Sequence, residues 1–183
     1  MNAYFILWPN DWCKRLLKAG DQGPLQVMYG GPHTSVPSLG KVQPGDLIYP
    51  VAVKNGELFI LGQLQVEHIS AAEDYLTTNN ISKLDYMWDT SAPQLLQQHP
   101  ELGHRVPRTC VDHAATGGGS HLRFDFSVPA ELVHQLQFGP KIGQEKPLIP
   151  GADGKVSTVS LQGHYRRLSA DSARLVAKLM QQF

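Results

Sequence analysis

Val42-Gln43-Pro44-Gly45-Asp46-Leu47-Ile48-Tyr49-Pro50-Val51-Ala52-Val53-Lys54-Asn55-Gly56-Glu57-Leu58-Phe59-Ile60-Leu61 is the stretch that decides the fold. Two runs rich in β-branched and aromatic residues flank the dipeptide Asn55-Gly56. A two-residue type I′ turn needs a positive φ at both central positions, which Asn and Gly tolerate best. The sequence therefore predicts a β-hairpin over 47–66. A turn at Pro44-Gly45-Asp46 leads into it.

Outside the hairpin, short strand patterns alternate with amphipathic helix patterns. We expect strands over 3–8, 25–29, 121–126 and 156–161, and helices near 11–19, 71–78, 92–98, 129–136 and 170–182. Helix caps are predicted at Asn10 or Asp11, Ser70, Ser91 and Ser169. The run Thr116-Gly117-Gly118-Gly119-Ser120 is expected to be a flexible loop. This order of elements predicts an α+β fold around a small curled barrel.

Composition and charge restrict the function classes. Hydrophobic residues make up 42% of the 183 residues and charged residues 17%, as in a globular domain. No apolar run approaches the roughly 20 residues that span a bilayer, so no membrane partner is expected. The N-terminus lacks signal-peptide features, and Cys13 and Cys110 are expected to be free thiols, so a cytoplasmic location is predicted.

The charges are unevenly distributed although the formal net charge is zero. A net charge of zero argues against wrapping a long stretch of phosphate backbone. Residues 141–183 hold seven Lys or Arg against three Asp or Glu. This part of the chain is predicted to be either a solvated basic face or an edge that faces nucleic acid.

Five features of the sequence occur together: an opening strand that ends in an aromatic residue, a glycine-containing polar loop, the Pro44-Gly45-Asp46 turn, the Ile60-Leu61-Gly62 segment, and Gln162-Gly163-His164-Tyr165-Arg166-Arg167-Leu168 before a last helix. In these features the chain resembles the PUA-like group that includes the EVE, ASCH and YTH domains, and is nearest to EVE. The resemblance implies one domain over 1–183, a β pseudobarrel with flanking helices. The core would be about 1–69 and 121–183, with a helical insertion at about 70–120.

The resemblance also implies a concave pocket that takes a nucleobase, modified bases included, of DNA or RNA. Aromatic walls stack on such a base, and polar groups read its edge. Carried onto this sequence, the pocket residues are expected to be Trp8, Tyr29, Gly31, His33, Thr34, Ser35, Tyr49 and Trp88. From the residues alone, Trp8 and Tyr49 are better explained as core side chains, and His33 and Ser35 as residues of a loop held by its own hydrogen bonds.

Phosphate contacts are expected from arginines. Arg166 and Arg167 lie in the basic C-terminal part, while Arg105 and Arg123 flank the glycine run. That run could also present backbone N–H groups to an anion, although it is not a Walker loop, because no Lys-Ser/Thr pair follows it.

Two other functions stay open. The segment 104–121 holds His104, Cys110, Asp112, His113 and His121, which could serve a hydrolase. Some ASCH relatives are amidohydrolases of modified bases that use Lys, Thr and Glu. Thr34 and Lys41 match this set only loosely, and no residue of this sequence is assigned to the Glu. No Cys-x-x-Cys or His-x-x-x-His pair occurs, so we expect neither metal nor cofactor. Alternatively, the 70–120 insertion could dock a protein partner through Tyr86, Met87 and Trp88.

Overall fold

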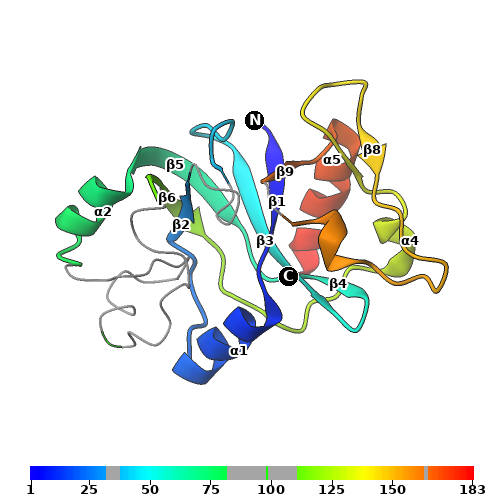
Figure 1. Cartoon of the computed structure of the whole chain (residues 1–183), viewed down its shortest axis with the longest axis horizontal. Helices are drawn as coiled ribbons and strands as arrows, with labels where there is room; N and C mark the ends of the chain where they lie inside the picture. Colours follow the sequence, from blue (N-terminus) through cyan, green and yellow to red (C-terminus); the bar gives the residue numbers. More distant parts are fainter. Residues whose placement is uncertain (32–37, 82–97, 99–110, 163–164) are drawn as a thin grey trace.

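The hairpin turn forms as the sequence predicts, but the run predicted as the second strand divides in two, because residues 61–63 belong to no strand and a separate strand begins at Leu64. The computed structural model describes residues 1–31, 38–81, 98, 111–162 and 165–183, and in it β3 spans Leu47–Lys54 and β4 spans Glu57–Ile60 (Figure 1). Val53 pairs with Leu58 and Lys54 with Glu57, which leaves Asn55 and Gly56 as the turn. Their φ angles are 53° and 86°, so both residues adopt the positive φ of a type I′ turn.

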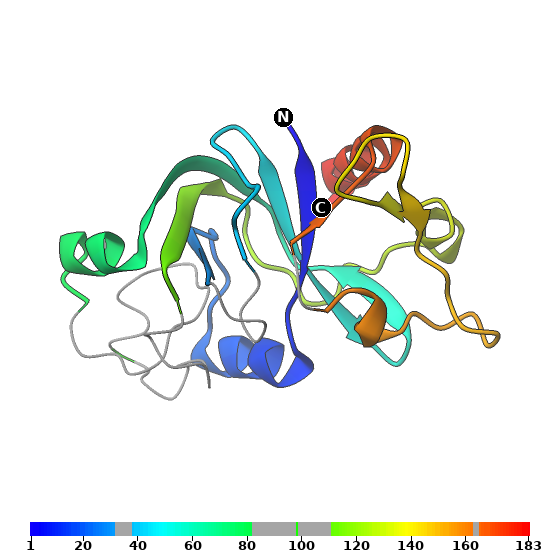
Figure 2. The same ribbon diagram turned by 45° about the horizontal axis from the view of Figure 1, so that its top comes forward.

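Strand β3 lies inside a seven-stranded sheet of order β2-β6-β5-β3-β1-β9, in which β4 pairs with β3 outside this order. The other strands are β1 (Ala3–Leu7), β2 (Val27–Gly30), β5 (Leu64–Ala71), β6 (His113–Gly119) and β9 (Arg166–Arg167). Strands β1 and β3 run parallel, and the other pairs are antiparallel. The sheet curls into a half-barrel (Figure 2). The predicted α+β class is confirmed, and the curl is compatible with a pseudobarrel.

The described helices flank this sheet (Figure 1). They are α1 (Asn10–Ala19), α2 (Ala72–Thr78), α4 (Ala130–Val133) and α5 (Ala170–Leu179), with 3-10 turns η3 (Thr158–Ser160) and η4 (Met180–Gln182). A small hairpin pairs β7 (Gln137–Phe138) with β8 (Lys146–Pro147). Within the described part of the chain, no helix combines the length and the apolarity that crossing a bilayer requires.

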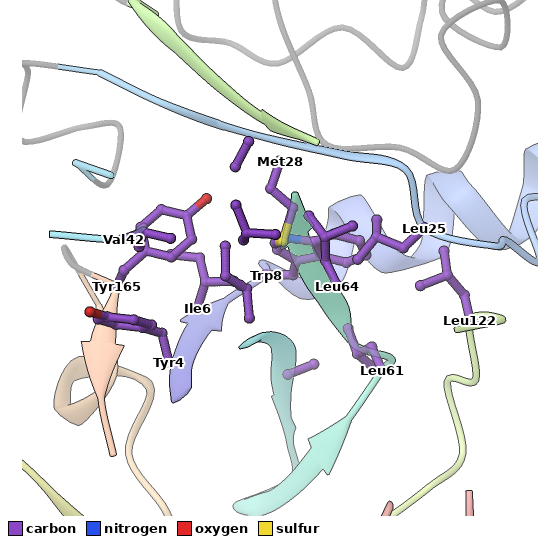
Figure 3. Packing of buried hydrophobic residues seen from close by; sticks show 14 of the residues in the cluster. Tyr4, Ile6, Trp8, Leu25, Met28, Val42, Leu61, Leu64, Leu122 and Tyr165 are labelled. Atoms are coloured by element: carbon purple, nitrogen blue, oxygen red, sulfur yellow. The ribbon is translucent and has the colours of Figure 1, made fainter. Parts of the chain in front are cut away.

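Strand β1 is buried on both faces, which explains its unbroken apolar sequence. Tyr4 and Ile6 belong to one core cluster, which also holds Trp8 and Trp12 (Figure 3). Ala3 and Phe5 belong to a second cluster, together with Val176 and Leu179 of α5. Successive side chains of a strand point to opposite faces, so β1 separates the two clusters.

The turn at Pro44-Gly45-Asp46 ties the start of β1 to β3. The buried Asp46 carboxylate accepts hydrogen bonds from the backbone N–H of Asn2 at 2.6 Å and of Gln43 at 3.0 Å. Gly45 has a φ of 91°, a conformation that favours glycine. The Pro-Gly-Asp sequence therefore fixes where β1 enters the sheet.

The prediction that residues 116–120 form a flexible loop is wrong. Residues 113–119 form β6, which pairs with both β2 and β5. This strand lies inside the 70–120 range that the resemblance implies to be an insertion. The reason is space: the carbonyl oxygens of Gln65 and Leu25 come so close to Gly117 and Gly119 that no side chain fits there.

Two predicted strands are also corrected. Residues 121–126 contain no strand, although Phe126 accepts a hydrogen bond from Ile60 N–H at 3.0 Å, and Ser127 forms an isolated bridge to Phe59. Residues 156–161 contain η3, because the Ser157 hydroxyl accepts a hydrogen bond from Val159 N–H at 3.3 Å and turns the chain.

The caps are partly as predicted. The Ser169 hydroxyl accepts from Ser172 N–H at 3.2 Å and caps α5, and Gly20, with a φ of 75°, ends α1. Ser70 is not a cap, because it is paired with Ala114 in the sheet and α2 starts after Ala71. Asn10 lies in the first turn of α1 and donates its amide to the Val53 carbonyl at 2.8 Å. Ser91, with most of the helix predicted over 92–98, lies outside the described residues.

Candidate ligand-binding pocket

A pocket of about 810 Å³ opens between β1, β9, the β7–β8 hairpin and the segment 38–42. Pockets that hold small ligands commonly have volumes of ~300–1,000 Å³. Two kinds of side chain stand out in its lining: the aromatic Tyr4, Phe138 and Tyr165, and the basic Lys41, Lys146, Arg166 and Arg167. Among the described residues, no acidic side chain lines it. The lining therefore suits a ligand that is both aromatic and negatively charged.

Two tyrosines form a rigid part of the wall. Their side chains lie together at one end of the first core cluster, beside Val42 (Figure 3). The Tyr4 hydroxyl donates to the Lys41 carbonyl at 3.0 Å, and the Tyr165 hydroxyl donates to the Tyr29 carbonyl at 2.9 Å. Because Tyr4 and Tyr165 are only 3% and 8% exposed, they shape the pocket more than they offer free ring faces.

The Tyr4 hydroxyl stays protonated at neutral pH. Burial raises its pKa above the ordinary value of 10.0, and the negative charge of Asp46 raises it further, while Arg167 opposes both effects. A neutral phenol donates a hydrogen bond, so the bond to the Lys41 carbonyl is kept. This bond fixes Lys41 at the pocket.

Phe138 is the aromatic side chain best placed to stack on a ligand. It is half-buried and packs against Phe5, with ring centroids 5.6 Å apart and planes inclined by 56°. It also forms an isolated β-bridge to Leu168, directly after β9. Contact with Phe5 thus holds Phe138 in place, while part of its side chain remains accessible to a ligand.

The two arginines of β9 differ in their contacts. Arg167 donates from Nε to the Gly139 carbonyl at 2.8 Å, and its Nη2 lies 3.8 Å from Glu145 Oε1. Arg166 donates from Nη2 to the Gln162 carbonyl at 3.2 Å. Its Nε is buried and has no hydrogen-bond partner among the described residues. The predicted pair Arg166 and Arg167 is therefore brought together in one pocket.

The aromatic residues Trp8, Tyr29 and Tyr49, which were predicted to form the pocket wall, lie outside this pocket. Trp8 packs edge-on against Trp12 at 6.2 Å, Tyr49 against Phe5 at 6.1 Å, and Tyr29 against Tyr75 at 6.0 Å. These three predicted residues are buried in three different clusters, and none of them lines the pocket. Burial raises the pKa of Tyr49 to about 12. Gly31 is buried after the end of β2.

Several predicted residues lie outside the described part of the chain: His33, Thr34, Ser35, Trp88 and Arg105. Their roles stay predictions. Ser38, Gly40 and Lys41 follow the first three in the sequence and line the pocket.

Arg123 does not join the β9 arginines. It pairs with Asp125 at 3.2 Å, donates to the Phe183 main-chain oxygen at 2.9 Å, and lies over the ring of Phe126. It lines a separate cavity of about 590 Å³ together with Lys54 and His121. Its guanidinium is thus already engaged by protein groups.

The alternative hydrolytic cluster is only partly described. Asp112 Oδ1 lies 2.8 Å from His113 Nδ1, and both side chains are about half exposed. His121 Nδ1 lies 3.2 Å from the Gln22 carbonyl. Within the described ranges, no three His, Cys, Asp or Glu side chains gather where they could hold a metal ion. His104 and Cys110, like Tyr86 and Met87 of the docking alternative, fall outside these ranges.

The prediction from sequence missed Tyr4, Phe138, Tyr165 and Lys146 as pocket residues. Tyr165 carried a usable signal, since it directly precedes Arg166-Arg167. Phe138 also carried one, because it stands before the Gly139-Pro140 turn that leads to Lys141. Tyr4 had no local signal that separates it from its neighbour Phe5.

No protein-family model matches this chain, and no curated protein matches it in sequence.

Proposed function

We propose that this protein binds nucleic acid by holding one nucleobase, modified bases included, in the pocket between β9 and the β7–β8 hairpin. The observation that carries the proposal is the joint lining of this pocket by Phe138, Tyr4 and Tyr165 with four basic side chains and, among the described residues, no acidic one. The proposal covers both DNA and RNA.

Stacking would supply most of the sequence-tolerant affinity. A base stacked on an aromatic side chain gains roughly 1–3 kcal/mol. Phe138 offers the accessible ring, and its contact with Phe5 holds that ring in one orientation. Ser38, Gln144 and Ser160 line the same pocket and can form hydrogen bonds with the edge of a base. Modification of that edge would change these hydrogen bonds directly.

The basic side chains would meet only a few phosphates. Lys41, Lys146, Arg166 and Arg167 are local to the pocket, while the chain as a whole carries no net charge. Each neutralised phosphate of a single strand contributes about −0.7 to the slope of log K against log salt. Two or three phosphates thus predict a shallow slope of about −1.4 to −2.1.

The test is a fluorescence-anisotropy titration with short single- and double-stranded DNA and RNA, plain and base-modified, at two salt concentrations. Phe138→Leu should weaken binding about 10-fold, because it removes the ring but keeps apolar contact with Phe5. Phe124→Leu is the matched control, since Phe124 lines the separate cavity with Arg123. Absence of saturable binding at low salt, or equal affinity of wild type and Phe138→Leu, would refute the proposal.

A further inference from the structure

The two adjacent arginines of β9 have different electrostatic environments. We infer that the pocket recognises its ligand as a single nucleotide, with the phosphate held by Arg166, while Arg167 is a positioning residue whose charge is balanced by Glu145. This inference rests on the proposed function and adds to it the chemical group that must accompany the base.

The Arg166 guanidinium has a hydrogen-bond donor, Nε, without an acceptor among the described residues. Its Nε is buried without a hydrogen-bond partner, and no carboxylate of the described residues lies within ion-pairing distance of its guanidinium. Its Nη2 donates a hydrogen bond to the Gln162 carbonyl at 3.2 Å. A buried N–H without a partner is unfavourable, and a phosphate can accept two parallel hydrogen bonds from a guanidinium. A phosphate oxygen would therefore satisfy Arg166.

Arg167 is already bound by other groups of the protein. Its Nε donates to the Gly139 carbonyl, and Gly139 N–H donates back to the Arg167 carbonyl at 3.0 Å. Glu145 lies 3.8 Å from Nη2, and the Arg167 and Glu145 side chains are only 18% and 13% exposed. Glu145 Oε2 also accepts from Gly143 N–H at 2.7 Å. Arg167 thus attaches the β7–β8 hairpin to β9, and the Glu145 carboxylate lies beside its charge.

Arg166 and the stacking ring of Phe138 line the same pocket. Arg166 stands opposite Phe5 in the β1–β9 register, and directly opposite residues of a sheet share a face. Phe138 packs on that same Phe5. The pocket has a volume of about 810 Å³. A base stacked on Phe138 and its own phosphate bound to Arg166 would therefore lie in the same pocket.

The experiment is a calorimetric titration with three kinds of probe: the four common nucleosides, their 5′-monophosphates, and inorganic phosphate. Wild type should bind one monophosphate at least 10-fold more tightly than the matching nucleoside, since hydrogen bonds to charged groups are the stronger ones. Arg166→Gln should remove this difference, and Arg166→Lys should keep part of it. Glu145→Gln should tighten monophosphate binding several-fold, because it frees the charge of Arg167 but keeps an acceptor for Gly143.

Arg174→Gln is the matched control, since Arg174 is exposed on α5 and pairs with Asp171 away from the pocket. Circular dichroism melting shows that each variant is folded. A phosphate preference that survives Arg166→Gln, or equal affinity for nucleoside and monophosphate, overturns the inference; oligonucleotide binding that depends on Phe138 would still leave the proposed function standing. Failure of every nucleotide and oligonucleotide to bind overturns both.

Discussion

The three consecutive glycines of β6 provide a sharp test of the fold. A Cβ added at Gly117 would lie 1.9 Å from the Gln65 carbonyl oxygen, and one at Gly119 would lie 2.1 Å from the Leu25 carbonyl oxygen. Real Cβ atoms essentially never show such distances, and both obstacles are backbone atoms that cannot rotate away. At Gly118 the nearest atom is the tip of the Glu67 side chain, at 3.6 Å.

The expected cost follows from these distances. Forcing extra atoms into a packed site costs typically 1–3 kcal/mol, and here β6 must move away from β5 or from the chain around Leu25. We expect Gly117→Ala and Gly119→Ala each to lower the free energy of unfolding by about 3 kcal/mol. Gly118→Ala should change it by less than about 1 kcal/mol, because the added methyl group meets ordinary contact distances and restricts the unfolded chain.

Urea unfolding followed by tryptophan fluorescence measures these differences. With an m value of about 2 kcal/mol/M, a loss of 3 kcal/mol lowers the midpoint by about 1.5 M. Gly118→Ala serves as the internal control, as it makes the same substitution one residue away. In a flexible loop, which the sequence pattern predicts here, all three substitutions would cost little. Three variants of equal stability would therefore refute the strand assignment.

Three further predictions concern buried polar groups. Asp46→Ala should cost about 2–4 kcal/mol in urea unfolding, because the Asn2 and Gln43 backbone N–H groups lose their acceptor; a loss below 1 kcal/mol would contradict this role. Burial raises the pKa of Cys13 from 9.0 to about 12 and that of Tyr49 from 10.0 to about 12. The unfolded chain therefore loses these two protons at a lower pH than the folded chain. Stability should therefore hold up to about pH 9 and fall towards pH 12, by up to about 1.4 kcal/mol per pH unit for each group; a flat profile between pH 8 and pH 11 is the contrary result. Ser169→Ala should cost about 1 kcal/mol through the lost cap of α5, measured as a lower Tm, and an unchanged Tm would argue against the cap.

The elements that the sequence predicts correctly depend on local chemistry. Asn55-Gly56 specifies its turn wherever it occurs between strands, and Ser169 caps the helix that follows it. Strand β6 could not be predicted in this way, because glycine has no preference for strands. It is a strand since β5 and the chain around Leu25 approach its backbone closely, and both are distant in the sequence. Residues 156–161 alternate like a strand, but Ser157 bends the chain locally.

Of the residues that line the candidate pocket, the sequence singles out two arginines as ligand-binding residues. The charge distribution along the sequence singled out Arg166 and Arg167, and the structure places both in one pocket. The aromatic residues could not be assigned from sequence, because a core aromatic and a pocket aromatic have the same pattern on a strand. Trp8 and Tyr49 are core residues, while Phe138 comes from a two-residue strand that periodicity cannot detect. The pocket itself joins segments more than 120 residues apart, such as Lys41 and Arg166.

The most direct measurement is an amide chemical-shift titration of the labelled protein with a nucleoside 5′-monophosphate and with a short single-stranded oligonucleotide. Binding in the proposed pocket predicts saturable shifts at Lys41, Phe138, Gly139 and Tyr165–Arg167, while amides around Gly20 and Arg123, which line the separate cavity, stay unchanged. Absence of shifts at high ligand concentration, or shifts confined to the cavity around Arg123, would contradict the proposal that this pocket binds a nucleotide.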